Sequence, residues 1–263
     1  MARPLFLLSN DDGVHAPGIR ALAEAVGGIA DWIIVAPHVE KSGSGQGISL
    51  VSPLRVEKLA ANIYAVEGTP ADCVMFALNR LMDRRPDFVI SGINRGANIG
   101  QDTLYSGTVA AAMEGCLHGL PAMAISLQGR RAFEKSDYVH AVQVVRKIFT
   151  HRDELAVAHG HVLNVNIPHV PLDQMQGIVV AGLGRRLYDN QITENTDPRG
   201  RPYFWIGGGG EDVEKIPNTD CTLLAERFVT ISALSPDRTN PVLHETLRNG
   251  AATRLSQAVF GRG

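Results

Sequence analysis

The chain has 263 residues, of which 44% are hydrophobic and 20% are charged, so its composition is that of a globular protein with enough chain for a sizeable core. Its formal net charge of -2 excludes the strongly basic surface typical of proteins that bind duplex nucleic acid or anionic membranes. No run of about 20 apolar residues occurs, so the sequence predicts no membrane-spanning helix.

Cysteine usage and the N-terminal segment bear on the cellular compartment. The three cysteines, Cys73, Cys116 and Cys221, are widely spaced and form no Cys-x-x-Cys pair, which argues against a zinc ribbon or a disulfide framework. The apolar stretch at residues 5–8 is too short for the core of a signal peptide. We therefore expect a cytoplasmic protein.

Short apolar runs alternate with helical patterns over the first 160 residues, which is typical of parallel strands joined by crossover helices. We expect strands over residues 4–8, 32–36, 88–91 and 122–126. Apolar residues at helical spacing predict helices over residues 18–26, 71–82, 107–119 and 136–149. Residues 48–66 alternate over short pieces and predict a β-rich insertion between two crossover units. This order predicts an α/β fold that is Rossmann-like, with a doubly wound and mostly parallel sheet.

Beyond about Val162 the pattern changes to strand-like stretches linked by polar loops. These stretches cover residues 161–168, 177–184, 201–210 and 227–234. We expect a single domain over residues 1–263, with a core of about 1–160 and a β-rich C-terminal extension of about 161–263. We expect this extension to be used in oligomerisation.

Three polar, glycine-rich loops follow predicted strands at equivalent positions. The first holds Asn10, Asp11, Asp12 and Gly13; the second spans residues 37–47 and includes Gly43; the third spans residues 92–108. In an open α/β sheet, ligands bind outside the carboxyl ends of the strands, where such loops converge. We therefore expect the three loops to form one shared cavity.

Asp11 and Asp12 place two adjacent carboxylates at the end of an apolar strand. Two unit charges about 4 Å apart repel by roughly 4 kcal/mol at an effective dielectric near 20. A divalent cation removes this repulsion; in the alternative arrangement, one Asp caps the next helix and the other points to water. The loops also offer the hydroxyls and amides of Ser42, Ser44, Asn94 and Asn98. Such hard oxygen donors, without a His or Cys cluster, favour Mg²⁺, Mn²⁺ or Ca²⁺ over Zn²⁺.

Ser106, Gly107 and Thr108 lie where the third loop turns into an alanine-rich helix. Their hydroxyls and free backbone N–H groups can bind an anion at the positive end of the helix dipole, although simple N-capping by Ser106 or Thr108 explains the same residues. The long Gly- and Asn-rich loop before them favours anion binding. By contrast, the segment at residues 68–73 is most simply the cap and first turn of a helix, and His15 a structural or solvent-facing residue.

Five motifs, in their order and spacing, resemble those of the SurE family of stationary-phase survival proteins, which are metal-dependent nucleotidases. They read "SNDDGVHAPGI", "VAPHVEKSGSG", "EGTPADCV", "SGINRGANIG" and "YSGTVAAAMEG". The match extends to "LNVNIP", "DPRGRPYFWIG" and the region around "FVTISAL", so it covers nearly the whole chain. Members of the family often carry Asp where this chain has His38, which we expect to face away from the metal.

The resemblance implies a binding site for one divalent metal ion per subunit, formed by Asp11, Asp12, Ser42 and Asn94. The ion is Mg²⁺ or Mn²⁺, with Ca²⁺ able to occupy the site in crystals, and the two acids are the catalytic residues. With Asn10 and Gly43 from the first two loops, the expected substrate-binding residues are Asn10, Gly43, Asn98, Ser106, Gly107 and Thr108.

The same resemblance implies a 5'-nucleotidase that hydrolyses nucleoside 5'-monophosphates, with 3'-monophosphates and short polyphosphate as further substrates. The expected assembly is a homodimer or homotetramer. Two alternatives stay open. A haloacid-dehalogenase-type phosphatase also has an Asp at the end of its first strand, but it uses an Asp-x-Asp pair, and the acids are adjacent here. A non-catalytic nucleotide sensor is disfavoured because paired carboxylates add negative charge to an anion site.

Overall fold

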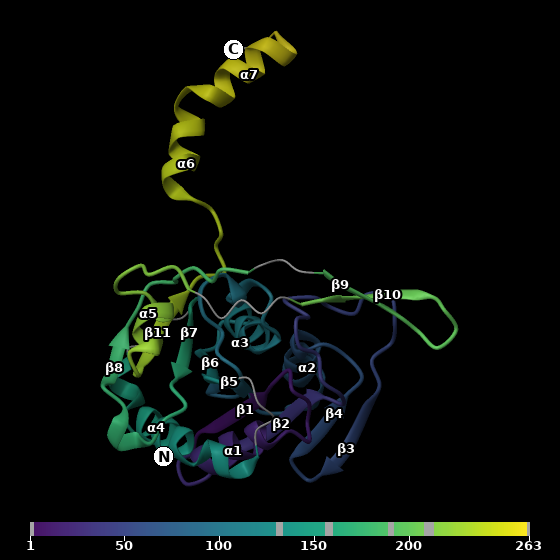
Figure 1. The fold of residues 1–263 in the computed structure, drawn as a ribbon, viewed down its shortest axis with the longest axis vertical. Coiled ribbons are helices and arrows are strands. Elements are labelled where there is room, and N and C mark those ends of the chain that lie inside the picture. Colours follow the sequence, from purple (N-terminus) through teal and green to yellow (C-terminus); the bar gives the residue numbers. More distant parts are fainter. Residues whose placement is uncertain (1–2, 130–133, 156–159, 189–191, 208–212, 262–263) are drawn as a thin grey trace.

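A nine-stranded mixed sheet forms the centre of the computed structural model, which describes residues 3–129, 134–155, 160–188, 192–207 and 213–261 (Figure 1). The strand order is β3-β4-β2-β1-β5-β6-β7-β11-β8, and neighbouring strands are parallel except in the pairs β3–β4 and β7–β11. The strands are β1 (Leu5–Ser9), β2 (Asp31–Pro37), β3 (Val56–Ala60), β4 (Ile63–Val66), β5 (Phe88–Arg95), β6 (Ala122–Leu127), β7 (Val162–Ile167), β8 (Gly177–Val180) and β11 (Phe228–Leu234).

Helices cover both faces of this sheet, so β1 is buried on both sides (Figure 1). Helices α1 (Pro17–Val26) and α4 (Val139–Thr150) pack on one face, and α2 (Pro70–Phe76) and α3 (Gly107–Leu117) on the other. Side chains alternate along a strand, so Phe6 and Leu8 enter the core under α1 and α4, whereas Leu7 enters the core under α2 and α3. This double burial explains why β1 reads as an unbroken apolar run.

Short helical turns complete the layers. They are η1 (Ala77–Leu81), η2 (Gly100–Leu104), η3 (Lys135–Tyr138), η4 (Arg152–Leu155) and η5 (Leu172–Gln174).

The predicted doubly wound α/β fold with a mostly parallel sheet is confirmed, and residues 56–66 of the predicted insertion form the β3–β4 hairpin at one sheet edge. No helix among the described residues is both long enough and apolar enough to cross a membrane.

The strand predicted at residues 88–91 is longer in the structure, because β5 continues to Arg95. Its pairing with β6 shifts register between Ser91 and Asn94 and then resumes, with Asn94 opposite Ser126. The prediction ends the strand at Ser91, because Gly92 begins the predicted third loop. Asn94 therefore lies at the end of a strand rather than in a free loop, which fixes its backbone beside the first loop.

The C-terminal part is β-rich as predicted, and β7, β8 and β11 extend the main sheet. Helix α5 (Asp220–Ala225) packs beside β11. A separate hairpin of β9 (Ile192–Thr196) and β10 (Pro202–Ile206) projects from the body (Figure 1). A helical segment also projects from it, made of α6 (Pro241–Thr246), η6 (Leu247–Ala251) and α7 (Ala252–Phe260). The expectation of strands and polar loops missed the helices at 241–260. Their start signal was present, because the Asn240 side chain accepts a hydrogen bond from the Leu243 N–H and Pro241 occupies the first turn.

Candidate active site

Asp11 follows β1 directly and is buried against the start of α3, with 4% of its surface exposed. The Thr108 hydroxyl donates a hydrogen bond to its carboxylate, and the Lys41 N–H donates to its carbonyl oxygen at 2.7 Å. Burial raises the pKa of Asp11 to about 6, because the hydrogen bond from Thr108 only partly offsets the loss of hydration and Asp12 adds negative charge. No ion pair among the described residues includes Asp11. Within the described part of the chain, its charge is therefore not compensated by a cation.

Asp12 lies closer to the surface and contacts Arg95 at the end of β5. The Arg95 N–H donates to its Oδ2 at 3.1 Å, and the Arg95 guanidinium lies 4.0 Å from its Oδ1. Burial raises the pKa of Asp12, although the hydrogen bond and charge of Arg95 act in the opposite direction and Glu40 adds to the rise. Because Arg95 also pairs with Glu40 at 3.1 Å, its single charge is shared between two carboxylates.

The second loop packs onto the first loop and onto the start of α3. Its Gly45 N–H donates to the Tyr105 carbonyl at 2.9 Å, next to the Ser106 turn. The Ser42 hydroxyl donates to Glu40 at 2.8 Å, so Ser42 is linked to Arg95 and Asp12 through Glu40. Sequence analysis gave no role to Glu40, although the motif "VAPHVEKSGSG" contains it.

Gly107 occupies a position where no side chain fits. A Cβ there would lie 2.7 Å from the Asp11 Cβ, 2.8 Å from the Ser44 Oγ and 3.0 Å from the Asp11 Oδ2. The Ser44 hydroxyl is buried and has no hydrogen-bond partner among the described residues. The glycine thus lets a carboxylate oxygen and an unpartnered hydroxyl approach the same small space. Ser44 therefore offers a further hard oxygen donor close to the Asp11 carboxylate.

Asn10 and Asn94 flank the carboxylates with side chains that are tied at one end only. The Asn10 amide donates to the Gly13 carbonyl at 2.9 Å, whereas its Oδ1 is buried without a partner among the described residues. The Asn94 amide donates to the Gly96 carbonyl at 2.7 Å. In both residues the N–H₂ end is used to fix the loop, which directs the oxygen end elsewhere.

Asn98 is held by a buried network beneath the third loop. Its N–H donates to the Asn166 Oδ1 at 2.8 Å, its carbonyl accepts from the amides of Asn164 and Asn166, and its own amide donates to the Ser126 Oγ at 2.8 Å. Sequence analysis gave no role to these network residues of β6 and β7. Asn at alternate positions of an apolar strand, as in "LNVNIP", was the signal that could have found two of them.

Ser106 caps α3, because its Oγ accepts the Val109 N–H at 3.1 Å. The capping explanation therefore holds for Ser106, whereas the Thr108 hydroxyl is directed to Asp11 instead. In the same way Thr69 and Asp72 form the capping box of α2, as expected. His15 and His38 are both exposed.

A further acid ties the third loop to the C-terminal part of the sheet. Asp220 is fully buried, and its two carboxylate oxygens accept the N–H groups of Gly100 at 2.9 Å and Gly184 at 2.7 Å. This tether holds the turn that leads into Ser106. Sequence analysis gave Asp220 no role, because its two partners are far from it along the chain.

The donor set fits a hard divalent ion. The described residues contain no group of three or more His, Cys, Asp and Glu side chains placed to hold a metal, so the site offers two carboxylates supplemented by neutral oxygens. Such a set suits Mg²⁺ or Mn²⁺, which keep bound waters and bind through one or two carboxylates. The structure thus brings Asp11, Asp12, Gly107 and Thr108 together and puts Asn94 and Ser42 at their margin.

The fold and the site define a class of protein: a doubly wound α/β protein with paired carboxylates at the carboxyl end of a central strand. The sequence profile described as "Survival protein SurE" matches residues 6–190. Two relatives are named "5'-nucleotidase SurE": one from Syntrophotalea carbinolica, 43% identical over 90% of this chain and 93% of its own length, and one from Vibrio parahaemolyticus, 45% identical over 94% and 93%. The crystal structure of the Sure protein from Aquifex aeolicus superposes with a TM-score of 0.78 at 35% identity, covering 94% of this chain and 99% of that one. The chain belongs to the survival protein SurE family.

Replacing Gly107 by Ala should disrupt the arrangement around Asp11. The added Cβ overlaps Asp11 and Ser44, so one of them must move away from the shared space. We expect affinity for Mg²⁺ or Mn²⁺, measured by isothermal titration calorimetry, to fall by about tenfold or more. Gly182→Ala, where a Cβ meets nothing within 4 Å, is the matched control and should bind the ion like the parent protein. Unchanged affinity in Gly107→Ala would show that the ion binds elsewhere.

Proposed function

We propose that this protein is a divalent-metal-dependent phosphatase that releases phosphate from nucleoside 5'-monophosphates. The observation that carries the proposal is the buried Asp11 carboxylate, which has Asp12 beside it and the N-terminus of α3 against it, and which pairs with no cation in the described part of the chain. The names of the relatives, 5'-nucleotidase SurE, support the same activity. Hydrolysis of 3'-monophosphates and short polyphosphate is part of the proposal.

Asp11 and Asp12 would hold the metal ion, with the Ser42 hydroxyl and the Asn94 amide oxygen as neutral ligands and one ion per subunit. A bound Mg²⁺ or Mn²⁺ supplies positive charge to a phosphate oxygen and lowers the pKa of the attacking water. Ser44, whose buried hydroxyl lies beside Gly107, is an additional oxygen donor close to the Asp11 carboxylate.

The phosphate would lie at the start of α3, where backbone N–H groups and the helix dipole favour negative charge. Ser106, Gly107 and Thr108 form this turn, and Asn10, Gly43 and Asn98 belong to the loops around it. Asp12, the more exposed of the two acids, would accept the proton of the attacking water. The water oxygen would bond to phosphorus as the bond to the ester oxygen breaks, and the proton held by Asp12 would pass to the ester oxygen through solvent, so that the nucleoside leaves as an alcohol.

Replacing Asp12 by Ala should lower the rate of phosphate release from nucleoside 5'-monophosphates by about a hundredfold or more, because the variant lacks both a ligand and the proton acceptor. The measurement is steady-state phosphate release with Mg²⁺ or Mn²⁺ present. Asp83→Ala removes an exposed acid outside the site and is the control. A fully active Asp12→Ala protein would contradict the assignment of Asp12 as ligand and proton acceptor. An unmodified protein that binds nucleotide without hydrolysing it would favour the alternative of a non-catalytic nucleotide sensor.

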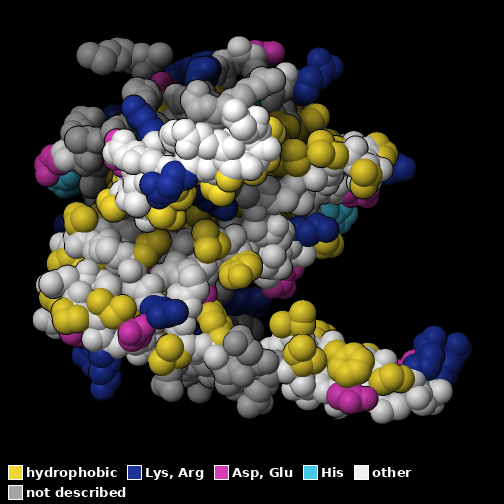
Figure 2. Space-filling view, turned by 90° about the horizontal axis from the view of Figure 1, so that it is seen from above, with side chains coloured by type: hydrophobic (Ala, Val, Ile, Leu, Met, Phe, Trp, Pro, Cys, Tyr) yellow, Lys and Arg dark blue, Asp and Glu magenta, His cyan; other side chains and the backbone are white. Residues whose placement is uncertain are grey.

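We also propose that the protein is a cytoplasmic homo-oligomer, a dimer or a tetramer, that assembles through its C-terminal part. Exposed apolar side chains gather on the projecting elements: Tyr203, Phe204, Trp205 and Ile206 on β10, and Val242, Leu243, Leu255, Val259 and Phe260 on α6 and α7. Figure 2 shows hydrophobic side chains along the arm formed by β9 and β10. Surfaces of this kind are typical of protein contacts.

The double variant Leu255→Asp, Val259→Asp should weaken this assembly, because it places two charges in the apolar stripe of α7. We expect the molar mass from light scattering after gel filtration to fall toward that of one 28.3 kDa chain. Thr253→Asp, Gln257→Asp adds the same charge outside that stripe and should leave the mass unchanged. A double variant that keeps the mass of the parent oligomer would exclude α7 from the interface.

A further inference from the structure

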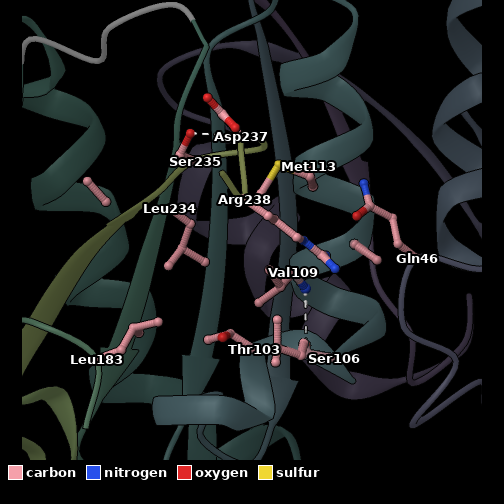
Figure 3. Close-up of a pocket in the computed structure, with 13 residues that line it drawn as sticks. Gln46, Thr103, Ser106, Val109, Met113, Leu183, Leu234, Ser235, Asp237 and Arg238 are labelled. Atoms are coloured by element: carbon pink, nitrogen blue, oxygen red, sulfur yellow. Dashed lines mark hydrogen bonds between the residues drawn. The ribbon is translucent and has the colours of Figure 1, made fainter. Parts of the chain in front are cut away.

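A cavity of about 250 Å³ lies along α3, starting where the candidate site ends (Figure 3). Ser106, Val109, Ala110 and Met113 line one side of it, at the three- and four-residue spacing that puts side chains on a single helix face. Ser106 is shared with the phosphate turn. The cavity therefore adjoins the proposed phosphate site at Ser106.

The opposite wall comes from the C-terminal part of the sheet. Leu234 ends β11, and Arg238 follows a few residues later. Figure 3 shows the Arg238 side chain extending toward Gln46 and the start of α3. The cavity thus has an apolar floor, made by α3 and Leu234, and a polar rim that includes the Gln46 amide, the Arg238 guanidinium, the Asp237 carboxylate and the Ser235 hydroxyl.

Gln46 is presented to this rim by a segment anchored on both sides. On one side the Gly45 N–H donates to the Tyr105 carbonyl at 2.9 Å. On the other side the Gly47 carbonyl accepts the Thr69 hydroxyl at 2.7 Å, and Ser49 donates its N–H and hydroxyl to Asp72. The backbone of Gln46 is therefore fixed although its side chain is exposed.

We propose that this cavity binds the base of the nucleotide, an inference that rests on the proposed function. A base is a flat aromatic ring with polar edges. The thioether of Met113 makes favourable contacts with such rings, and a guanidinium such as that of Arg238 stacks on them. The amide of Gln46 donates to and accepts from the polar edge of the base. The volume of about 250 Å³ lies just below the roughly 300–1,000 Å³ typical of small-molecule sites, which suits one ring system rather than a polymer.

A larger cavity of about 510 Å³ lies between α1 and the β3–β4 hairpin, and His15, Arg20 and Trp32 are among its lining residues. It shares no residue with the predicted metal or phosphate sites. A nucleotide held by its phosphate at the start of α3 has the cavity along α3 as its adjoining space, because Ser106 belongs to both.

Two variants test the proposal. Ala110→Leu adds bulk to the cavity floor, and Arg238→Ala removes an exposed stacking group without disturbing the core. For each, kcat/KM is measured for adenosine 5'-monophosphate and for ribose 5-phosphate, which has the same phosphate and sugar but no base. The ratio of the two values should fall by about tenfold in each variant. Ala61→Leu makes the same change in the exposed β3–β4 turn and should keep the ratio of the parent protein.

The outcomes separate this inference from the proposed function. A ratio that stays unchanged in both variants, whether the rates fall together or not at all, would overturn the base site and leave the phosphatase activity standing. A parent protein that releases phosphate from neither substrate would overturn the proposed function and this inference with it. A misfolded Ala110→Leu protein loses both activities together, in which case the exposed Arg238→Ala variant decides.

Discussion

The structure depends on two adjacent carboxylates placed at the end of its central strand. Asp11 is buried with its pKa raised to about 6, and Asp12 beside it shares the charge of Arg95 with Glu40. Nothing in hydrophobic packing favours this arrangement, because burial and mutual repulsion both disfavour the charged forms. A bound divalent cation would offset both costs. The resulting need for a cation, next to a helix N-terminus suited to phosphate, is the physical basis of the proposed activity.

Much of the surrounding structure serves to hold three loops against this pair. Gly107 allows α3 to approach Asp11, and Thr108 donates a hydrogen bond to it. Asp220 ties the third loop to the C-terminal strands by accepting two backbone N–H groups. The capping box of α2 also anchors the end of the second loop, because Asp72 accepts two hydrogen bonds from Ser49, just after that loop. Elements from the N-terminal and the C-terminal parts of the sheet thus hold the three loops together. The proposed base cavity lies beside these loops, between α3 and the end of β11.

The sequence predicted the parts that depend on local pattern. The double burial of β1, the crossover helices and the position of Asp11 and Asp12 at a strand end follow from periodicity and from the rule for open sheets. It did not predict that β5 runs on to Arg95 or that Asn164 and Asn166 fix Asn98, because pairing partners decide these features. The helices at 241–260 were missed although the sequence carries their start signal at Asn240 and Pro241 and an apolar stripe along α7.

The most direct test of the central claim is phosphate release by metal-stripped protein from a panel of nucleoside monophosphates, with Mg²⁺, Mn²⁺, Ca²⁺ or Zn²⁺ added back one at a time. The account predicts no release without metal, release restored by Mg²⁺ or Mn²⁺, and no restoration in Asp11→Ala. Turnover that persists after complete metal removal, or that Asp11→Ala retains with metal, would contradict it.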